Sequence, residues 1–204
     1  MRLLGTGAEA SLFLDDYLGL PAVVKRRSAK SYRHPELDRQ LRSSRTRREA
    51  RLLREARRAG VRTPLVYDVD LQESVLILEM VEGEKLRVVL EERPEDAPAL
   101  CRRVGEALGR LHSGRVAHGD LTTSNMILMP DGEICLLDIS LGESMADLEA
   151  MGVDVHLFRR AFLSAHSSLE DAYDDFLEGY SGSNPEAAAV LARAEDIEGR
   201  GRYT

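Results

Sequence analysis

The chain has 204 residues, of which 43% are hydrophobic and 31% charged, and it contains 16 glycines and 7 prolines. This composition excludes collagen-like, low-complexity and wholly disordered proteins, and no stretch has the length and apolarity of a membrane span. Two cysteines, Cys101 and Cys135, are too few for a disulfide framework or a zinc site, and both are expected to be buried. With no signal peptide expected after Met1, the sequence favours a soluble protein of the reducing cytosol.

The net charge of −7 conceals a segregation of charge along the chain. Between Lys25 and Arg58 there are 14 Lys and Arg residues against 4 Asp and Glu residues, whereas the other residues carry 14 basic and 31 acidic groups. This Arg-rich segment is interpreted either as a solvated helix face or as an electropositive patch for phosphate or RNA. Lysine is uncommon in the sequence and occurs only at Lys25, Lys30 and Lys85.

The first 80 residues are predicted to form a five-stranded antiparallel sheet with one major helix. Short apolar runs between turn residues indicate strands at Leu3–Leu4, Ser11–Leu14, Pro21–Lys25, Val66–Val69 and Val75–Met80. The pair Asp15-Asp16 and the following Gly19 are expected in a turn. A short helical piece is expected to begin at Pro35, and a separate helix is expected from Thr46 to Ala59, ended by Gly60.

Beyond Glu82-Gly83 the pattern becomes helical. Helices are predicted over Leu86–Glu92, Ala97–Leu111, Asp147–Ala165, Leu169–Tyr180 and Pro185–Asp196. A compact turn at Pro130-Asp131-Gly132 separates two short strands, Asn125–Met129 and Glu133–Leu137. The sequence therefore predicts an α+β protein in which a β-rich half, residues 1–81, is hinged to a helical half, residues 82–204, with a ligand cleft between them.

A glycine-rich turn is predicted between the first two strands. Its residues are Gly5, Thr6, Gly7, Ala8, Glu9 and Ala10. Glycines allow backbone N–H groups to approach a polyphosphate, although such turns are also common for structural reasons alone. Lys25 ends an apolar strand, where a compact ammonium suits a phosphate contact. Glu49 lies on the inward face of the helix, where it can either hold Lys25 or pair with an arginine one turn away.

The strongest motif is HGDLTTSN at His118–Asn125, followed by LLD at Leu136–Asp138. Asp120 and Asn125 lie five positions apart in a loop between a helix and a strand, and Asp138 is predicted to end the next strand. Asn125 and Asp138 offer the oxygen ligands that Mg²⁺ prefers, and Asp120 can orient an attacking hydroxyl or accept its proton. Taken singly, each of these residues is also a common turn former.

In this order the motifs resemble the signature set of the protein-kinase fold, over roughly residues 3–165. The resemblance implies a bilobal fold with Asp120 as the catalytic residue, Asn125 and Asp138 as the metal ligands, and Asp154 bracing the loop of Asp120. The implied ATP-binding residues are Gly5–Ala10, Lys25, Glu49, Glu79 through its carbonyl and Val81 through its N–H.

Several departures from the kinase pattern are specific. Gly119 replaces the arginine that usually precedes the catalytic aspartate, and Thr122 replaces the lysine usually found two residues after it. No Ala-Pro-Glu activation segment follows Asp138, so the helical half is expected to be minimal. Losing these cations and this segment favours a slow phosphotransferase or an ATPase without a phosphorylation switch.

Four strings together are similar to one small family: YRHPELD (Tyr32–Asp38), RTRREARLL (Arg45–Leu53), HGDLTTSNM and VDVHLFRRAF (Val153–Phe162). This family is the atypical kinase/ATPase subunit of the KEOPS complex, which forms threonylcarbamoyl-adenosine in tRNA. The resemblance implies an atypical serine/threonine kinase or ATPase of the cytoplasm that uses ATP and Mg²⁺. Its implied partners are the threonylcarbamoyl-transferase subunit, a small regulatory subunit, and tRNA contacted through the complex and the Arg-rich segment. The last residues, from Gly199, are shorter and less basic than that family's usual tail.

Two other functions stay open. Small-molecule phosphotransferases similar to aminoglycoside or choline kinases also carry HGD followed by an asparagine at this offset, but they usually need a larger helical half. A non-catalytic nucleotide-binding scaffold is the second alternative, and it is opposed by the complete set of Lys25, Glu49, Asp120, Asn125 and Asp138.

The remaining histidines and aromatic residues are expected to have structural roles. His118, Tyr173, Phe176 and Tyr180 are predicted to pack in the interior, the last three because they recur at helical spacing. His112 and His166 have no metal-ligand spacing and are predicted to lie at the surface or at helix ends.

Overall fold

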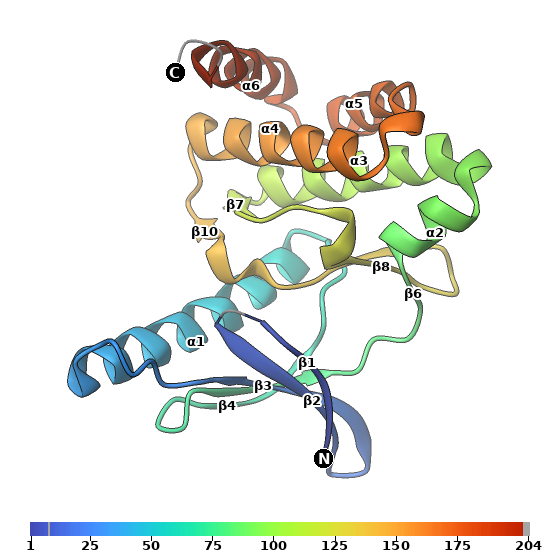
Figure 1. Cartoon of the computed structure of the whole chain (residues 1–204). Helices are drawn as coiled ribbons and strands as arrows, with labels where there is room; N and C mark the ends of the chain where they lie inside the picture. The colour runs from blue at the N-terminus through green and yellow to red at the C-terminus, as the bar shows by residue number, and fades with distance from the viewer. Residues whose placement is uncertain (8, 202–204) are drawn as a thin grey trace. The chain divides into compact units, whose positions relative to one another are not determined.

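The computed structural model describes residues 1–7 and 9–201 (Figure 1). The chain forms two compact units, and each is described by itself. Unit 1 comprises Met1–Arg54 and Pro64–Val81, and unit 2 comprises Glu55–Thr63 and Glu82–Thr204. None of the helices in the described residues is long and apolar enough to cross a membrane.

Unit 1 contains the predicted five-stranded antiparallel sheet, in the order β1-β2-β3-β5-β4. Its strands are β1 (Arg2–Thr6), β2 (Ala10–Tyr17), β3 (Leu20–Arg27), β4 (Val66–Asp70) and β5 (Val75–Glu79). The central strand β3 pairs with β2 on one side and with β5 on the other, so Lys25 lies opposite Leu12 and Leu76. The sheet therefore fixes the Lys25 backbone on both sides.

The hairpin between β2 and β3 corrects the predicted turn. Asp15 and Asp16 belong to β2, and the turn consists of Leu18 and Gly19, whose φ angles are 55° and 85°. Two consecutive residues with positive φ form the tight turn that matches the twist of a hairpin, so the strand continues further than predicted. Asp16 still supports the turn, because its Oδ1 accepts the Gly19 N–H at 2.8 Å.

A single helix, α1 (Pro35–Arg58), replaces the two helical pieces that the sequence predicts. No glycine or proline follows Pro35 within it, and an ion pair of 2.7 Å between Asp38 and Arg42 bridges its first turns. Its buried residues, Glu49, Leu52, Leu53 and Ala56, recur at spacings of three and four, as predicted.

The helices of unit 2 are α2 (Leu86–Glu92), α3 (Ala97–Ser113), α4 (Leu148–Ala165), α5 (Ala172–Ser183) and α6 (Ala187–Gly201). One antiparallel sheet has the order β6-β8-β9, formed by Glu84–Lys85, Met126–Leu128 and Ile134–Leu136. A second pairs β7 (Val116–Ala117) with β10 (Glu143–Ser144). Short 3₁₀ turns occur at Pro94–Asp96, Thr123–Asn125, Ile139–Leu141 and Ser167–Leu169.

Two helices of unit 2 begin later than predicted. The 3₁₀ turn Ser167–Leu169 precedes α5, which begins at Ala172 rather than at Leu169. Before α6, the side chain of Asn184 accepts the Glu186 N–H at 3.0 Å and holds a turn, so the helix begins at Ala187 rather than at Pro185.

The core of unit 2 lies around α3 and α5, whose backbones are in close contact. A Cβ atom at Gly105 would lie 2.0 Å from the Phe176 carbonyl oxygen, and one at Gly179 would lie 2.1 Å from the Arg102 carbonyl oxygen. Phe158, Phe162, Phe176 and Tyr180 fill the space beside this contact and are fully buried. Each contributes roughly 1.5–3 kcal/mol through burial. The core positions predicted for Phe176 and Tyr180 are confirmed, whereas Tyr173 is half-buried.

Candidate active site

The glycine-rich turn of unit 1 joins β1 to β2. The Gly7 N–H donates to the Ala10 carbonyl at 2.8 Å, and Thr6 pairs with Ser11 in the ladder, so the ends of the turn are closed. Glu9 forms an ion pair with Arg45 of α1, a partner 36 residues away that the sequence did not indicate. Ala8, another predicted nucleotide contact, lies outside the described residues. The glycine-rich turn is therefore linked to α1 through the carboxylate of Glu9.

Lys25 and Glu49 meet as predicted, and a second cation joins them. The Nζ of Lys25 lies 2.7 Å from Oε1 of Glu49, and Nη2 of Arg27 lies 2.8 Å from Oε2. Lys25, Arg27 and Glu49 are 6%, 3% and 1% exposed, so two buried cations share one carboxylate. Arg27 was not predicted, although it lies two positions after Lys25 and a strand places such residues on one face. Glu49 is thus oriented by both of its oxygens.

The residues predicted for adenine lie at the end of β5. The Glu79 side chain accepts the Leu65 N–H at 2.9 Å, and the Glu79 N–H donates to the Leu65 carbonyl at 2.9 Å. The carboxylate of Glu79 therefore fixes the segment that leads into β4, whereas the predicted adenine contact is one of its backbone carbonyl. Val81, the last residue of unit 1, is buried.

In unit 2, Asp120 and Asn125 are in direct contact. The Asn125 Nδ2 group donates to the Asp120 carbonyl oxygen at 2.9 Å and to its carboxylate Oδ2 at 3.0 Å. Because the amide nitrogen is committed to Asp120, the amide oxygen of Asn125 is left to face another partner. Asn125 belongs to the 3₁₀ turn Thr123–Asn125 rather than to the strand, whose first residue is Met126.

Backbone hydrogen bonds from Leu137 tie Asp138 to this loop. The Leu137 N–H donates to the Asn125 carbonyl at 2.8 Å, and its carbonyl oxygen lies 3.0 Å from Nε2 of His118. The other ring nitrogen of His118 lies 3.3 Å from the Asp120 N–H, so the imidazole donates through Nε2 and accepts through Nδ1. Burial lowers the pKa of His118, although the nearby charge of Asp154 opposes the shift.

Asp138 itself corrects one prediction. It follows the end of β9 at Leu136 by two positions and adopts a left-handed conformation, with φ of 53° and ψ of 61°. Aspartate tolerates this conformation better than most residues, because its short side chain can bond locally. Such local strain recurs at functional sites, and the metal-ligand role of this carboxylate stays a prediction.

Asp154 braces the loop, as the kinase resemblance implied. Its carboxylate accepts the His118 N–H through Oδ2 and the Gly119 N–H, at 2.7 Å, through Oδ1. Burial alone would raise the pKa of Asp154, but the hydrogen bond from His112 and the contacts with His118 hold it below its usual value. The loop carrying Asp120 is therefore fixed by a buried, ionised carboxylate.

His112, in the last turn of α3, and His166, the C-cap of α4, lie at helix ends, as one of the two predicted alternatives had it, but both side chains are buried and hydrogen-bonded rather than at the surface. His112 Nε2 lies 3.2 Å from Asp154 Oδ2, and its Nδ1 lies 2.8 Å from the Tyr180 hydroxyl. Asn184 donates to that hydroxyl at 2.7 Å, so Tyr180 uses its own proton on His112. His166 Nε2 lies 3.0 Å from Thr123 Oγ1 and supports the 3₁₀ turn that contains Asn125.

The structure explains why Gly119 stands where kinases have an arginine. Its φ is +80°, and a Cβ atom there would lie 2.5 Å from the carbonyl carbon and oxygen of Leu141. The chain after Asp138 runs directly against the loop, where β10 pairs with β7. It reaches α4 at Leu148, ten positions after Asp138 (148 − 138), in agreement with the predicted lack of an activation segment.

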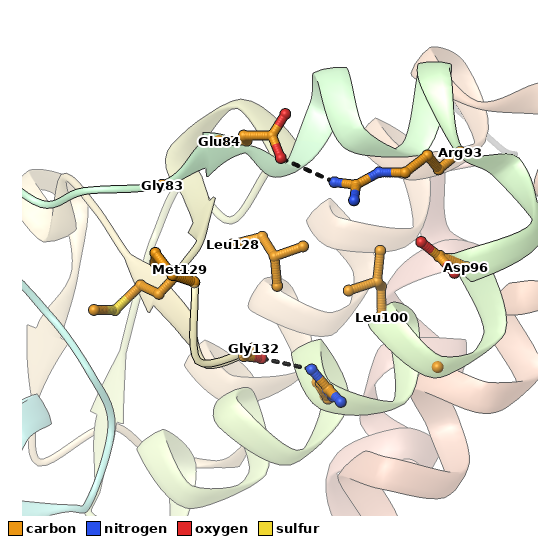
Figure 2. Close-up of a pocket in the computed structure, with 11 residues that line it drawn as sticks. Gly83, Glu84, Arg93, Asp96, Leu100, Leu128, Met129 and Gly132 are labelled. Atoms are coloured by element: carbon orange, nitrogen blue, oxygen red, sulfur yellow. Dashed lines mark hydrogen bonds and ion pairs between the residues drawn. The ribbon is translucent and has the colours of Figure 1, made fainter.

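A separate cavity in unit 2, of about 470 Å³, is lined by residues of β6, α3 and the turn between β8 and β9 (Figure 2). Leu100 and Leu128 lie in the middle of the view, between the Glu84–Arg93 pair, at 3.0 Å, and Gly132. The Gly132 carbonyl accepts a hydrogen bond from Arg103 at 2.7 Å. None of the predicted site residues lines this cavity, and its charged groups balance one another. The cavity is therefore not assigned as the active site.

Comparison with known proteins identifies the relatives of the chain. A family model described as RIO domain matches residues 22–160. KEOPS complex subunit Bud32 of Pyrococcus abyssi is 41% identical over 213 residues, which cover 100% of this chain and 96% of the relative. A probable bifunctional tRNA threonylcarbamoyladenosine biosynthesis protein of Methanothermobacter thermautotrophicus is 41% identical over 99% of this chain and 36% of the relative. The protein of that name in Methanoculleus marisnigri is 43% identical over 97% and 35%. The chain thus spans about a third of the length of these bifunctional relatives.

Proposed function

The chain belongs to the RIO-domain family, as a homologue of KEOPS complex subunit Bud32, and from this premise we propose that it is a Mg-ATP-dependent phosphotransferase or ATPase that supports threonylcarbamoyl-adenosine modification of tRNA. The RIO kinase family uses ATP, and the finer assignment of reaction and metal is our inference. In this proposal residues 1–81 and 82–204 act as the two lobes of a kinase.

The observation that carries the proposal is the hydrogen-bonded cluster around Leu137. Leu137, the residue before Asp138, is hydrogen-bonded to Asn125 and His118. Asn125 in turn donates hydrogen bonds to both the backbone carbonyl and the carboxylate of Asp120. Such a cluster would fix the side chains of Asp120, Asn125 and Asp138 relative to one another. Phosphoryl transfer needs this, because its catalysis depends mostly on positioning and charge stabilisation.

Asn125 and Asp138 fit a magnesium ion in this scheme. The contact of Asn125 Nδ2 with Asp120 leaves the amide oxygen as a ligand, and Asp138 adds a carboxylate. No group of three or more His, Cys, Asp or Glu side chains in the described residues could hold a metal by itself. Mg²⁺ suits such a sparse set, because it usually keeps waters and phosphate oxygens beside one or two protein ligands. When bound, the ion would neutralise charge on the phosphates.

The protein groups would act in the transfer as follows. Lys25, fixed by Glu49, would hold the α- and β-phosphates, and the amides of the glycine-rich turn would meet the phosphate chain. The Glu79 carbonyl and the Val81 N–H would hold the adenine. The oxygen of water or of a serine or threonine hydroxyl bonds to the terminal phosphorus, and its proton passes to Asp120. The bond from phosphorus to the bridging oxygen breaks, and its electron pair leaves with ADP.

The proposed partners follow from the relatives. The matching part of the bifunctional relatives is continuous with a longer chain named for tRNA threonylcarbamoyladenosine biosynthesis, so we infer that this chain acts beside the threonylcarbamoyl-transferase subunit. A small regulatory subunit of the KEOPS complex and tRNA are further proposed partners, the latter through the complex and the Arg-rich segment.

The experiment is phosphate release from ATP by the full chain, alone and with the transferase subunit, at saturating Mg²⁺. Wild type is expected to release phosphate, and Asp120→Asn is expected to reduce the rate by at least about a hundredfold, within the range for a general base. Asp131→Asn is the matched control, since Asp131 lies in the exposed turn after β8. Equal rates for wild type and Asp120→Asn would refute the proposal.

A further inference from the structure

Lys85 is one of the rare lysines of the chain, and the structure places its ammonium on the loop of the candidate site. It is the second residue of β6, where it pairs with Ile127 of β8, and it is followed directly by the buried Leu86 of α2. Its Nζ donates to the Ser124 carbonyl oxygen at 2.8 Å, across a separation of 39 residues. Ser124 lies immediately before Asn125, so the ammonium is fixed beside a proposed magnesium ligand.

The charge of Lys85 is not neutralised by this contact. Its partner is a neutral carbonyl, and no ion pair to Lys85 is present among the described residues. Nearby arginines differ, because Arg87 pairs with Glu91 at 2.9 Å and Arg93 pairs with Glu84 at 3.0 Å. Partial burial lowers the pKa of Lys85, while the charge of Asp138 opposes the shift.

The loop needs a cation that it does not itself contain. From His118 to Asn125 it carries one carboxylate and no lysine or arginine, and Asp138 adds a second negative charge. A terminal phosphate approaching these carboxylates gains charge-assisted hydrogen bonds only from groups that reach the loop from elsewhere. Lys85 is a group of unit 2 that does so by direct contact.

We propose that Lys85 is a further catalytic residue, whose ammonium contacts the terminal phosphate of the nucleoside triphosphate and stabilises the charge on its oxygens during transfer. One N–H of the ammonium is used on Ser124, and the other two can bond phosphate oxygens. Lys85 stays protonated throughout, because the proton of the attacking hydroxyl goes to Asp120 and the electron pair of the broken bond leaves with ADP. The inference rests on the proposed function.

The test compares Lys85→Met, Lys85→Arg and Arg87→Met in the full chain. Arg87→Met is the matched control, because it removes the same charge from an exposed position two residues away that contacts Glu91 instead of the loop. Affinities for ATP and ADP are measured with and without Mg²⁺, and phosphate release is measured at saturating ATP. Thermal unfolding verifies that each variant is folded.

We expect Lys85→Met to weaken ATP binding about fivefold with ADP affinity unchanged, the size of effect expected for an exposed charge contact. The maximal rate should fall by about tenfold or more, and Lys85→Arg should recover part of both effects. Equal weakening of ATP and ADP binding, or the same changes in Arg87→Met, would overturn the inference and leave the proposed function standing. A wild-type chain that neither binds nor hydrolyses ATP would overturn both.

Discussion

The imidazole of His118 lies 3.0 Å from the carbonyl oxygen of Leu137 and thereby joins the loop of Asp120 to the segment of Asp138. Its Nδ1 accepts the Asp120 N–H at the same time, and only a neutral ring can make both contacts. Protonation would turn this acceptor into a donor and leave two N–H groups facing each other. The protonation state of this buried histidine therefore affects how the loop of Asp120, the predicted catalytic residue, is held beside the segment of Asp138, the predicted metal ligand.

The neutral state of His118 predicts how the free energy of unfolding depends on pH. Burial lowers the pKa of folded His118 below its ordinary value of 6.5, so the unfolded chain binds the proton first as the pH falls. The contribution of His118 is complete above about pH 6.5 and is lost progressively as the pH falls toward the folded pKa. We expect the free energy of unfolding to fall more between pH 7.5 and pH 5 in wild type than in His118→Gln.

Urea unfolding at both pH values, with wild type and variant side by side, measures this difference. His166 and His156, whose pKa values burial also lowers, are present in both proteins, so the comparison isolates His118. An equal loss of stability on acidification in both proteins would contradict the assignment of the effect to His118.

A second prediction concerns the chain of hydrogen bonds from Asn184 through Tyr180 and His112 to Asp154. Tyr180→Phe removes the donor to His112 and should cost about 1–3 kcal/mol, the range for leaving a buried polar group unpaired. It should also reduce the protection of the Gly119 amide from hydrogen exchange, because that N–H donates to the same carboxylate.

The matched control is Tyr173→Phe, which makes the same chemical change on the same helix. Tyr173 is half-buried and packs against Phe158 and Phe176. Unfolding and amide exchange are measured for both variants. If both variants leave Gly119 equally protected, the chain of hydrogen bonds does not position the loop.

The buried cluster of Lys25, Arg27 and Glu49 gives a third prediction. The number of buried charges left without a partner should decide which variant loses more stability. Glu49→Gln leaves two buried cations without a carboxylate and should destabilise unit 1 by about 3–5 kcal/mol. Arg27→Met leaves a balanced Lys25–Glu49 pair and should cost far less, or even be neutral. Denaturant unfolding of both variants provides the measurement, and a larger loss of stability for Arg27→Met would contradict the charge explanation.

Asp138 gives a fourth prediction, in which the choice of variant follows from its backbone. Its left-handed conformation, with φ of 53°, costs roughly 1–2 kcal/mol for most residues, so alanine would confuse strain with the loss of the carboxylate. Asp138→Asn tolerates the conformation and should keep the fold while abolishing Mg-dependent phosphate release. We expect the same loss of activity in Asn125→Ala. Full activity in either purified variant at saturating Mg²⁺ would remove these residues from the metal site.

The features of the site that could be predicted from the sequence are those that follow from local motifs and from the periodicity of strands and helices. Lys25 met Glu49 because one lies near the end of β3 and the other lies on the buried face of α1. Arg27 was missed, because the strand was predicted to end at Lys25, whereas it continues to Arg27 and places that residue on the same face. His112 was missed for another reason: its partner Tyr180 is 68 residues away, so the contact exists only in the folded unit.

The same limit applies to the charges of the Arg-rich segment. Only four carboxylates lie within the segment itself, and sequence proximity offers its arginines no other partners. Arg42 does pair with Asp38, but Arg45 pairs with Glu9, which lies outside the segment. Arg47, Arg51 and Arg54 are exposed and follow one another at spacings of four and three, so they form a stripe along one face of α1.

This stripe makes the last prediction, for tRNA. An acidic protein with an exposed row of arginines has a surface suited to a polyanion, and each phosphate contact releases counterions. Replacing Arg47, Arg51 and Arg54 with Gln should lower tRNA affinity and reduce the slope of the log–log salt plot by about 0.7 to 0.9 for every phosphate that the variant no longer binds. The control, Arg42→Gln with Arg45→Gln, removes two half-buried arginines of the same helix that lie outside the stripe and should change the slope less. Binding is measured across a salt series, with the chain alone and with the transferase subunit. Wild-type affinity and slope for the stripe variant in both settings would assign the stripe to solvent or to a protein partner instead of RNA.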